Sequence, residues 1–223
     1  MICLDFDDTI VLENTTRQIH ARFAAEGWEE AERRRARGEL TVEQANAAAF
    51  ATVEATEGEM REYAVSVARP RDGFLELLDW AHWNEWLPVV VSNGYDFYID
   101  AILSNLGVDR VAQHAGRTVR DYRWRVRYYS PRGIEIEEGF KLAYATAFRS
   151  AGDFVAYVGD GASDVAAARV APAVFARSTL LAELNGSHGR VRPFETFQDV
   201  IATLEREAPA WLASFSSTTA AGD

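Results

Sequence analysis

Short apolar runs alternate with amphipathic stretches along most of the chain. Residues 1–6 form an apolar run that ends in an acidic cluster, and similar runs occupy residues 87–92, 154–158 and 173–176. Such runs are typical of strands that are buried on both faces of a parallel sheet. Residues 122–128 instead alternate apolar or aromatic residues with arginines, which predicts a half-exposed hairpin strand.

Helical spacing of apolar residues follows most of these runs. The pattern predicts helices over residues 74–80, 97–106, 163–170 and 196–205. Strands that alternate with helices predict an α/β fold with a doubly wound parallel sheet.

Residues 15–69 interrupt this alternation. The stretch is rich in Ala, Glu and Arg, and residues 41–44 (Thr-Val-Glu-Gln) match a capping box that begins a helix. We therefore expect a small all-helical cap at 15–69, inserted after the first strand, and a core built from residues 1–14 and 70–210. Small residues dominate the end of the chain, so residues 211–223 are expected to form a flexible tail.

Composition narrows the choice of partner. The 223 residues are 48% hydrophobic and carry a formal net charge of −11, which suits one globular core with an insertion and argues against binding the nucleic-acid backbone. The same charge would repel a phosphorylated ligand at long range. A phosphate site would therefore need local cations or backbone N–H donors.

The single cysteine and the first residues of the chain indicate the cellular compartment of the protein. Cys3 is the only cysteine, which excludes an intrachain disulfide, and its place in the first strand favours a buried structural role. The apolar start gives way at once to acidic residues, so we expect neither a signal peptide nor a membrane span. The sequence therefore predicts a cytoplasmic protein, and it leaves both monomer and homodimer open.

Two predicted strands end in carboxylates. Residues 5–9 read Asp-Phe-Asp-Asp-Thr, and residues 158–164 read Val-Gly-Asp-Gly-Ala-Ser-Asp. One acidic strand end alone is also explained by turn formation and helix capping. Because ligands bind at the carboxyl ends of parallel strands, two such ends can converge on one hard cation, which prefers oxygen ligands.

Two further segments could serve a phosphate group. Residues 92–94 (Ser-Asn-Gly) follow a predicted strand and offer a hydroxyl and backbone N–H groups, although a plain turn has the same sequence. Lys141 lies at the start of a predicted helix in an acidic chain, where a solvated surface lysine is the ordinary alternative.

In order and position, these four segments resemble the four motifs of the haloacid dehalogenase superfamily. The resemblance spans almost the whole chain and implies a Rossmann-like core. It implies a phosphatase in which Asp5 is the nucleophile that forms a phospho-aspartate. It also implies that Asp7 is the general acid and base.

The resemblance assigns the other site residues as well. It implies that Thr9, Ser92, Lys141 and the backbone of Asn93 and Gly94 bind the phosphoryl group. It implies one Mg²⁺, held by the Asp5 carboxylate, the Asp7 carbonyl and Asp160. By the same resemblance Asp164 supports the metal or Lys141.

The helical insertion sits where this superfamily places a cap that excludes water and selects a small phosphorylated metabolite. The arrangement is similar to the phosphoserine phosphatase-like subgroup, especially its methionine-salvage member that acts on a methylthio-pentenyl phosphate. Phosphoserine phosphatases carry a glutamate nine residues beyond the nucleophile. That position is Asn14 here, with Glu13 one place earlier, so phosphoserine is not the expected substrate.

Alternatives remain at this stage. A phosphotransferase or mutase of the same fold would pass the phosphoryl group to a second substrate, and a phosphate-binding protein without turnover would keep the fold alone. The basic run Arg33, Arg34, Arg35 and Arg37 is expected to pair with nearby glutamates on a solvated helix.

Overall fold

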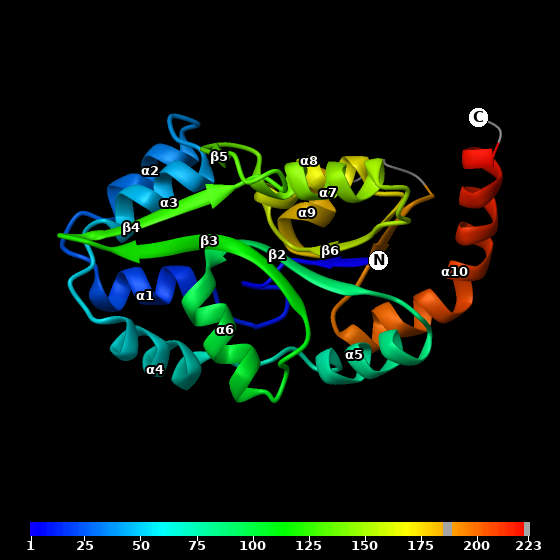
Figure 1. Ribbon diagram of the computed structural model, residues 1–223, viewed down its shortest axis with the longest axis horizontal. Coiled ribbons are helices and arrows are strands. Elements are labelled where there is room, and N and C mark those ends of the chain that lie inside the picture. Colours follow the sequence, from blue (N-terminus) through cyan, green and yellow to red (C-terminus); the bar gives the residue numbers. More distant parts are fainter. Residues whose placement is uncertain (185–188, 221–223) are drawn as a thin grey trace.

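The computed structural model describes residues 1–184 and 189–220. Within them an eight-stranded sheet runs through the molecule in the order β5-β4-β3-β2-β1-β6-β7-β8 (Figure 1). Six strands form its parallel part, while β4 and β5 are antiparallel additions at one edge. The strands are β1 (Ile2–Leu4), β2 (Pro88–Tyr95), β3 (Ala112–Arg120), β4 (Trp124–Tyr129), β5 (Glu135–Ile136), β6 (Ala156–Gly159), β7 (Ala173–Ala176) and β8 (Val191–Pro193).

Strand β1 lies at the centre of the parallel part. Its side chains are fully buried, and Leu4 pairs with Val90 of β2 and with Val158 of β6. Because the three strands are parallel and in register, the residues that follow each of them emerge at the same edge of the sheet. The acidic and hydroxyl segments predicted to meet therefore share one edge.

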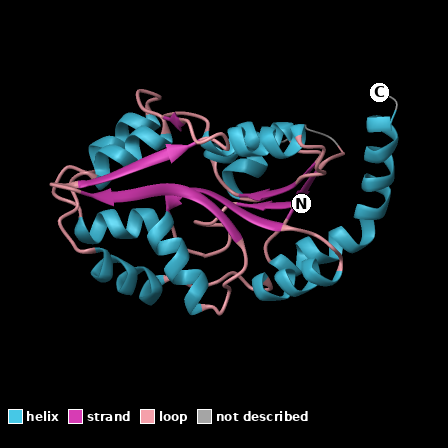
Figure 2. Ribbon diagram, viewed as in Figure 1, coloured by secondary structure: helices cyan, strands magenta, loops and turns pink. Residues whose placement is uncertain are grey.

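Helices cover both faces of the sheet (Figure 2). On one face lie α5 (Phe74–Trp83), α6 (Asp96–Asn105) and the first half of α10 (Phe197–Ala220). The other face carries α7 (Phe140–Ser150), the short 3₁₀ helix η1 (Ala162–Asp164), α8 (Val165–Val170) and α9 (Ser178–Glu183). This arrangement confirms the predicted doubly wound α/β fold.

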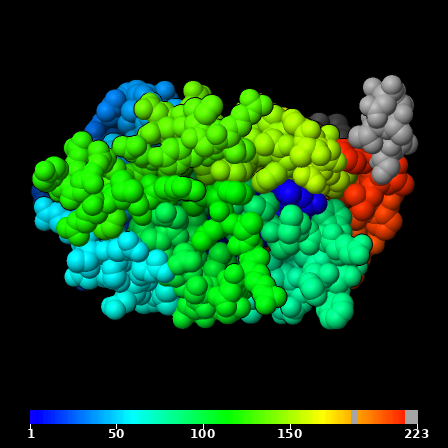
Figure 3. Space-filling model, in the orientation of Figure 1, coloured from blue at the N-terminus to red at the C-terminus, as the bar shows by residue number. Residues whose placement is uncertain are grey.

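The insertion after β1 forms four helices, α1 (Thr15–Phe23), α2 (Glu29–Ala36), α3 (Val42–Phe50) and α4 (Glu57–Val67). The predicted capping box of Thr41 and Gln44 begins α3. These helices gather with the β3–β4 hairpin at one end of the molecule, as the blue, cyan and green segments show (Figure 3). Phe50 of α3 packs against Tyr95 and Trp124, which ties the insertion to the sheet.

Several features differ from the sequence-based expectations, since β3, β5, β8 and α9 were not predicted and α10 is longer than expected. Strand β3 was not predicted, because its first residues are only partly buried and lack a clear apolar alternation.

The flexible tail predicted from residue 211 was wrong over 211–220, where α10 continues. Trp211 and Phe215 lie four residues apart and pack against Phe154, which anchors this part of the helix. The rest of the predicted tail, residues 221–223, lies outside the described residues.

In the described part of the chain, no helix is both long enough and apolar enough to span a membrane.

Candidate active site

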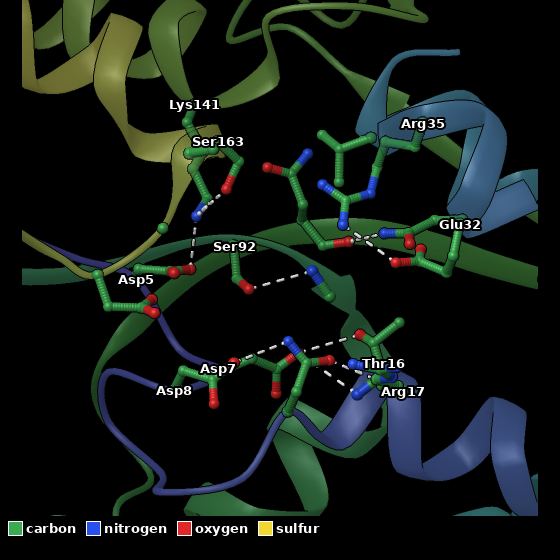
Figure 4. A pocket seen from close by; sticks show the side chains of 18 of the residues that line it. Asp5, Asp7, Asp8, Thr16, Arg17, Glu32, Arg35, Ser92, Lys141 and Ser163 are labelled. Atoms are coloured by element: carbon green, nitrogen blue, oxygen red, sulfur yellow. Dashed lines mark hydrogen bonds and ion pairs between the residues drawn. The ribbon is translucent and has the colours of Figure 1, made fainter. Parts of the chain in front are cut away.

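Asp5 follows β1 and is buried beside a lysine. Its Oδ1 lies 2.8 Å from Nζ of Lys141, the second residue of α7. The same ammonium donates to Oδ1 of Asp164 at 2.7 Å and to Oγ of Ser163 at 3.1 Å. Figure 4 shows Lys141 pointing from its helix toward Asp5 at the edge of the cavity. Lys141 and the segment of residues 158–164, both singled out in the sequence, therefore meet the segment of residues 5–9.

Carboxylates outnumber cations at this point. Oxygens of Asp5, Asp160 and Asp164 lie within 4.8 Å of one another, and Lys141 is the ammonium that pairs with two of them. Burial raises the pKa of Asp5 well above its ordinary value, and the Asp164 charge raises it further against the opposing effect of Lys141. Burial and Asp164 likewise raise the pKa of Asp160 to about 6. With all three ionised, two negative charges stay uncompensated, which matches a divalent cation.

Asp164 is already saturated with hydrogen-bond donors. Its Oδ1 accepts from Lys141 and from the Tyr157 hydroxyl, and its Oδ2 accepts from the backbone N–H groups of Gly161 and Asp160. The residue is fully buried, so it orients Lys141 and the turn after β6. Asp5 and Asp160 are left as the carboxylates that can offer oxygens to a cation. Such hard oxygen donors suit Mg²⁺.

Lys141 keeps its charge in this setting. Burial lowers the pKa of its ammonium, but the charges of Asp164 and Asp5 outweigh burial and raise that pKa above its ordinary value. A permanently charged lysine beside Asp5 can stabilise an anionic group there.

Thr9 occupies a different place from the one expected of a phosphate ligand. Its side chain is fully buried and is not among the residues that line the cavity. The hydroxyl instead donates to Oδ1 of Asp160 at 3.3 Å. Thr9 therefore orients a carboxylate of the acidic cluster.

Asp7 lines the cavity and is held from three sides. Its Oδ1 accepts from the backbone N–H of Thr15 at 3.0 Å, and its Oδ2 accepts from the hydroxyls of Tyr98 at 2.6 Å and Thr16 at 3.0 Å. Burial raises the pKa of Asp7, while the hydrogen bonds from Tyr98, Thr15 and Thr16 oppose that rise. Tyr98 and Thr16 were not predicted from the sequence as residues of the site. The available signal for Tyr98 was its position one helical turn after Gly94.

Ser92, Asn93 and Gly94 also line the cavity. The Ser92 Oγ accepts from the Gly94 backbone N–H at 3.1 Å, in the last part of β2, where the pairing of β2 with β3 shifts in register. A Cβ at residue 94 would overlap the hydroxyl of Tyr98, which explains why glycine is required. The segment thus presents a hydroxyl and closely approachable backbone to the same space as Asp5.

The cavity has a volume of about 410 Å³ and is closed on one side by the inserted helices. Figure 4 shows Glu32 and Arg35 of α2 approaching it opposite Asp7 and Asp8. The arginine run of α2 forms the expected pairs with glutamates, including Arg35 with Glu32 at 3.0 Å. Further lining residues from the insertion are Arg17, His20, Trp28, Val42 and Asn46.

Asn14, nine residues beyond Asp5, and its neighbour Glu13 form contacts of their own. Asn14 caps α1 through its Oδ1 and donates from Nδ2 to Asp8, and Glu13 pairs with Arg69. Both side chains are therefore engaged in hydrogen bonds or ion pairs.

Comparison with known proteins identifies the family. The model of haloacid dehalogenase-like hydrolases matches residues 2–169, which is most of the chain. The chain therefore belongs to the haloacid dehalogenase-like hydrolase family, as the motifs predicted.

Individual relatives refine this assignment. A protein of Bacillus thuringiensis subsp. konkukian named 2-hydroxy-3-keto-5-methylthiopentenyl-1-phosphate phosphatase is 27% identical over 90% of this chain and 94% of its own length. Similar proteins of the same name come from Bacillus cereus and Bacillus anthracis. These relatives are phosphatases and support a phosphomonoester hydrolase.

Solved structures share the fold. One described as a phospho-aspartyl intermediate analogue of phosphoserine phosphatase is 21% identical, with a TM-score of 0.66 over 90% of this chain and 96% of that chain. A probable phosphoserine phosphatase from Vibrio cholerae is 18% identical, with a TM-score of 0.68 over 92% of this chain and 63% of that one.

Proposed function

We propose that this protein is a Mg²⁺-dependent phosphatase that hydrolyses a small phosphorylated metabolite through a phospho-aspartate on Asp5. The single observation that carries the proposal is the ion pair of the buried Asp5 with Lys141, in the same cavity as Asp7 and the segment of residues 92–94. Asp5 as the nucleophile, Lys141 as the cation and Asp7 as the general acid then act on one phosphoryl group.

Asp5 performs the first step. An oxygen of its carboxylate attacks phosphorus, the P–O bond to the substrate alcohol breaks, and Asp7 donates a proton to the departing oxygen. Asp7 is then ionised and takes a proton from water, which attacks phosphorus and releases Asp5 and inorganic phosphate. The hydroxyl partners of Asp7 suit both its protonated and its ionised form, because a hydroxyl group can accept a hydrogen bond as well as donate one.

Neutralisation of charge supports the attack. A carboxylate and a phosphate dianion repel each other, and Lys141 lies within 2.8 Å of the attacking carboxylate. The Asp5 and Asp160 carboxylates and the Asp7 carbonyl would hold Mg²⁺, which supplies further positive charge to the phosphoryl oxygens. The Ser92 hydroxyl and the backbone N–H groups after it would orient those oxygens. Thr9 and Asp164 would act indirectly, through Asp160 and Lys141.

The proposed substrate is a small phosphomonoester of the class named for the Bacillus relatives, 2-hydroxy-3-keto-5-methylthiopentenyl-1-phosphate. A cavity of about 410 Å³ suits a ligand of this size. The use of Asn14 and Glu13 in other contacts argues against phosphoserine. The proposed location is the cytoplasm, where the single buried Cys3 would stay reduced.

Phosphate release from p-nitrophenyl phosphate and from a panel of phosphorylated sugars, ketoses and amino acids tests the proposal. We expect release that requires Mg²⁺, stops with a chelator, and falls by a factor of about 10³ or more in Asp5→Asn, since the nucleophile is lost. Asp79→Asn, an exposed residue of α5, is the matched control. Full activity in Asp5→Asn would refute the assigned nucleophile.

A further inference from the structure

Glu43 connects the inserted helices to two segments of the active site. This carboxylate lies in the first turn of α3 and is only 3% exposed. Its Oε1 accepts from the Phe140 backbone N–H at 2.9 Å and from the Asn93 side-chain amide at 3.2 Å. Phe140 immediately precedes Lys141, and Asn93 follows Ser92 in the last part of β2. One oxygen of the insertion therefore touches both phosphate-binding segments.

Helix α7 lacks a capping side chain of its own. Its N-cap is Gly139, with φ 73°, which offers no side-chain acceptor to the free N–H groups of the first turn. Glu43 supplies that acceptor from a different part of the chain. A carboxylate at a helix N-terminus also interacts favourably with the helix dipole. If α3 moved away, the start of the helix that carries Lys141 would lose this partner.

Asn46 reinforces the contact with Asn93. It lies three residues after Glu43, so the two side chains share a face of α3. The Asn46 Nδ2 donates to the Asn93 carbonyl at 2.8 Å and lies 3.0 Å from the Tyr128 hydroxyl, which donates to the same carbonyl at 2.5 Å. Asn93 is therefore held at its side chain and at its backbone by residues of α3 and β4.

The capping box of α3 makes a second contact with the segment before α7. The Thr41 hydroxyl donates to the Glu137 carbonyl at 2.5 Å, and the Gln44 amide donates to the Glu137 carboxylate at 3.1 Å. These contacts are exposed to solvent, whereas the Glu43 contact is buried. Loss of a buried acceptor leaves two donors unsatisfied, so Glu43 should dominate the coupling.

We propose that Glu43 is a positioning residue that couples the seating of helices α1–α4 to the arrangement of Asn93 and Lys141. The proposal rests on the proposed phosphatase function. With the inserted helices in place, Glu43 orders the end of β2 and the start of α7 together. With those helices displaced, both segments lose an acceptor, and the phosphate-binding groups are no longer held in one arrangement.

Three variants test this role. Glu43→Met keeps the length of the side chain but removes the acceptor, whereas Glu43→Gln keeps an acceptor oxygen and removes the charge. Thr56→Ala is the matched control, because Thr56 caps α4 in the same insertion and its side-chain hydrogen bonds, among the described residues, are with Glu59. It lowers stability without affecting the start of α7.

Kinetics and amide hydrogen exchange are measured on all three. We expect Glu43→Met to lower kcat/KM for p-nitrophenyl phosphate by about tenfold or more and to weaken inhibition by inorganic phosphate similarly, as loss of a hydrogen bond to a charged group predicts. Exchange of the Phe140 amide should accelerate in this variant. Glu43→Gln should restore most of each property, and Thr56→Ala should match the wild type in all of them.

Each outcome decides the question. Wild-type kinetics and phosphate inhibition in Glu43→Met, or an equal loss in Glu43→Gln, would overturn the positioning role. If the wild-type protein hydrolyses no phosphomonoester, the proposed function fails separately. The coupling is then judged by exchange at Phe140 alone, and unchanged exchange in Glu43→Met would refute it.

Discussion

The hydroxyl of Tyr98 donates a 2.6 Å hydrogen bond to Oδ2 of Asp7, and both residues are buried. Tyr98 belongs to α6, the helix that begins directly after β2, the strand that contains Ser92. The Thr16 hydroxyl lies 2.8 Å from the Tyr98 hydroxyl and donates to the same carboxylate oxygen. The orientation of the proposed general acid is therefore set by a residue outside the acidic motif.

Removal of the Tyr98 hydroxyl should affect substrates unequally. Tyr98→Phe keeps the ring packing but frees the Asp7 carboxylate, so kcat for alkyl phosphates should fall by about tenfold. The effect on p-nitrophenyl phosphate should be smaller, because its leaving group needs little protonation. Steady-state kinetics across leaving groups of different pKa measures this difference. A uniform loss would contradict the link to proton donation.

A side chain at residue 94 should damage the same contact. The added Cβ in Gly94→Ala would overlap the Tyr98 hydroxyl, which must then move away from Asp7. We expect lower activity and a lower melting temperature than in the wild type. Adding Tyr98→Phe to Gly94→Ala should recover part of the stability, because the overlapping atom is removed. Unchanged activity in Gly94→Ala would contradict the observed packing.

Loss of the Asp164 charge should destabilise the core. Asp164 accepts four hydrogen bonds in a fully buried position, and Asp164→Asn would place an amide group against donors such as Lys141. We expect the free energy of unfolding to fall by about 3 kcal/mol and activity to fall with it. Urea unfolding measures the first effect, with Asp79→Asn as the control. A change below about 0.5 kcal/mol, which is usual for surface sites, would contradict this role.

His20 should make stability depend on pH. Burial lowers the pKa of His20 from 6.5 to about 4, and its Nε2 lies 2.7 Å from the Tyr95 hydroxyl. Between these pH values the unfolded chain binds a proton that the folded protein does not. The contribution is therefore fully present above pH about 6.5 and is lost as pH falls toward about 4, amounting to about 3 kcal/mol.

The His20→Gln variant isolates this contribution. The amide does not titrate, so the free energy of unfolding of the variant should decline less than that of the wild type between pH 7 and pH 4.5. Chemical unfolding at both pH values measures the difference. Parallel declines would show that His20 is not the responsible group.

Local pattern was enough to predict the elements that bear the chemistry. The apolar runs before Asp5, Ser92 and Asp160 identify parallel strands, since burial on both faces excludes polar residues from them. Strand β3 was missed because nearly all of its residues are exposed or only partly buried, which weakens the apolar pattern. The continuation of α10 was missed because its anchor, Phe154, lies far away in the sequence.

The sequence by itself determined the parallel α/β sheet, the helical insertion and the order of the four polar segments, because each depends on periodicity within a short stretch. Only the tertiary structure decided how their side chains are used. In the folded protein, hydrogen bonds join Thr9 with Asp160, Asp164 with Lys141, Tyr98 with Asp7, and Glu43 with Phe140. These contacts join residues on different elements, and a buried polar group must find its partner wherever packing brings one within hydrogen-bond distance.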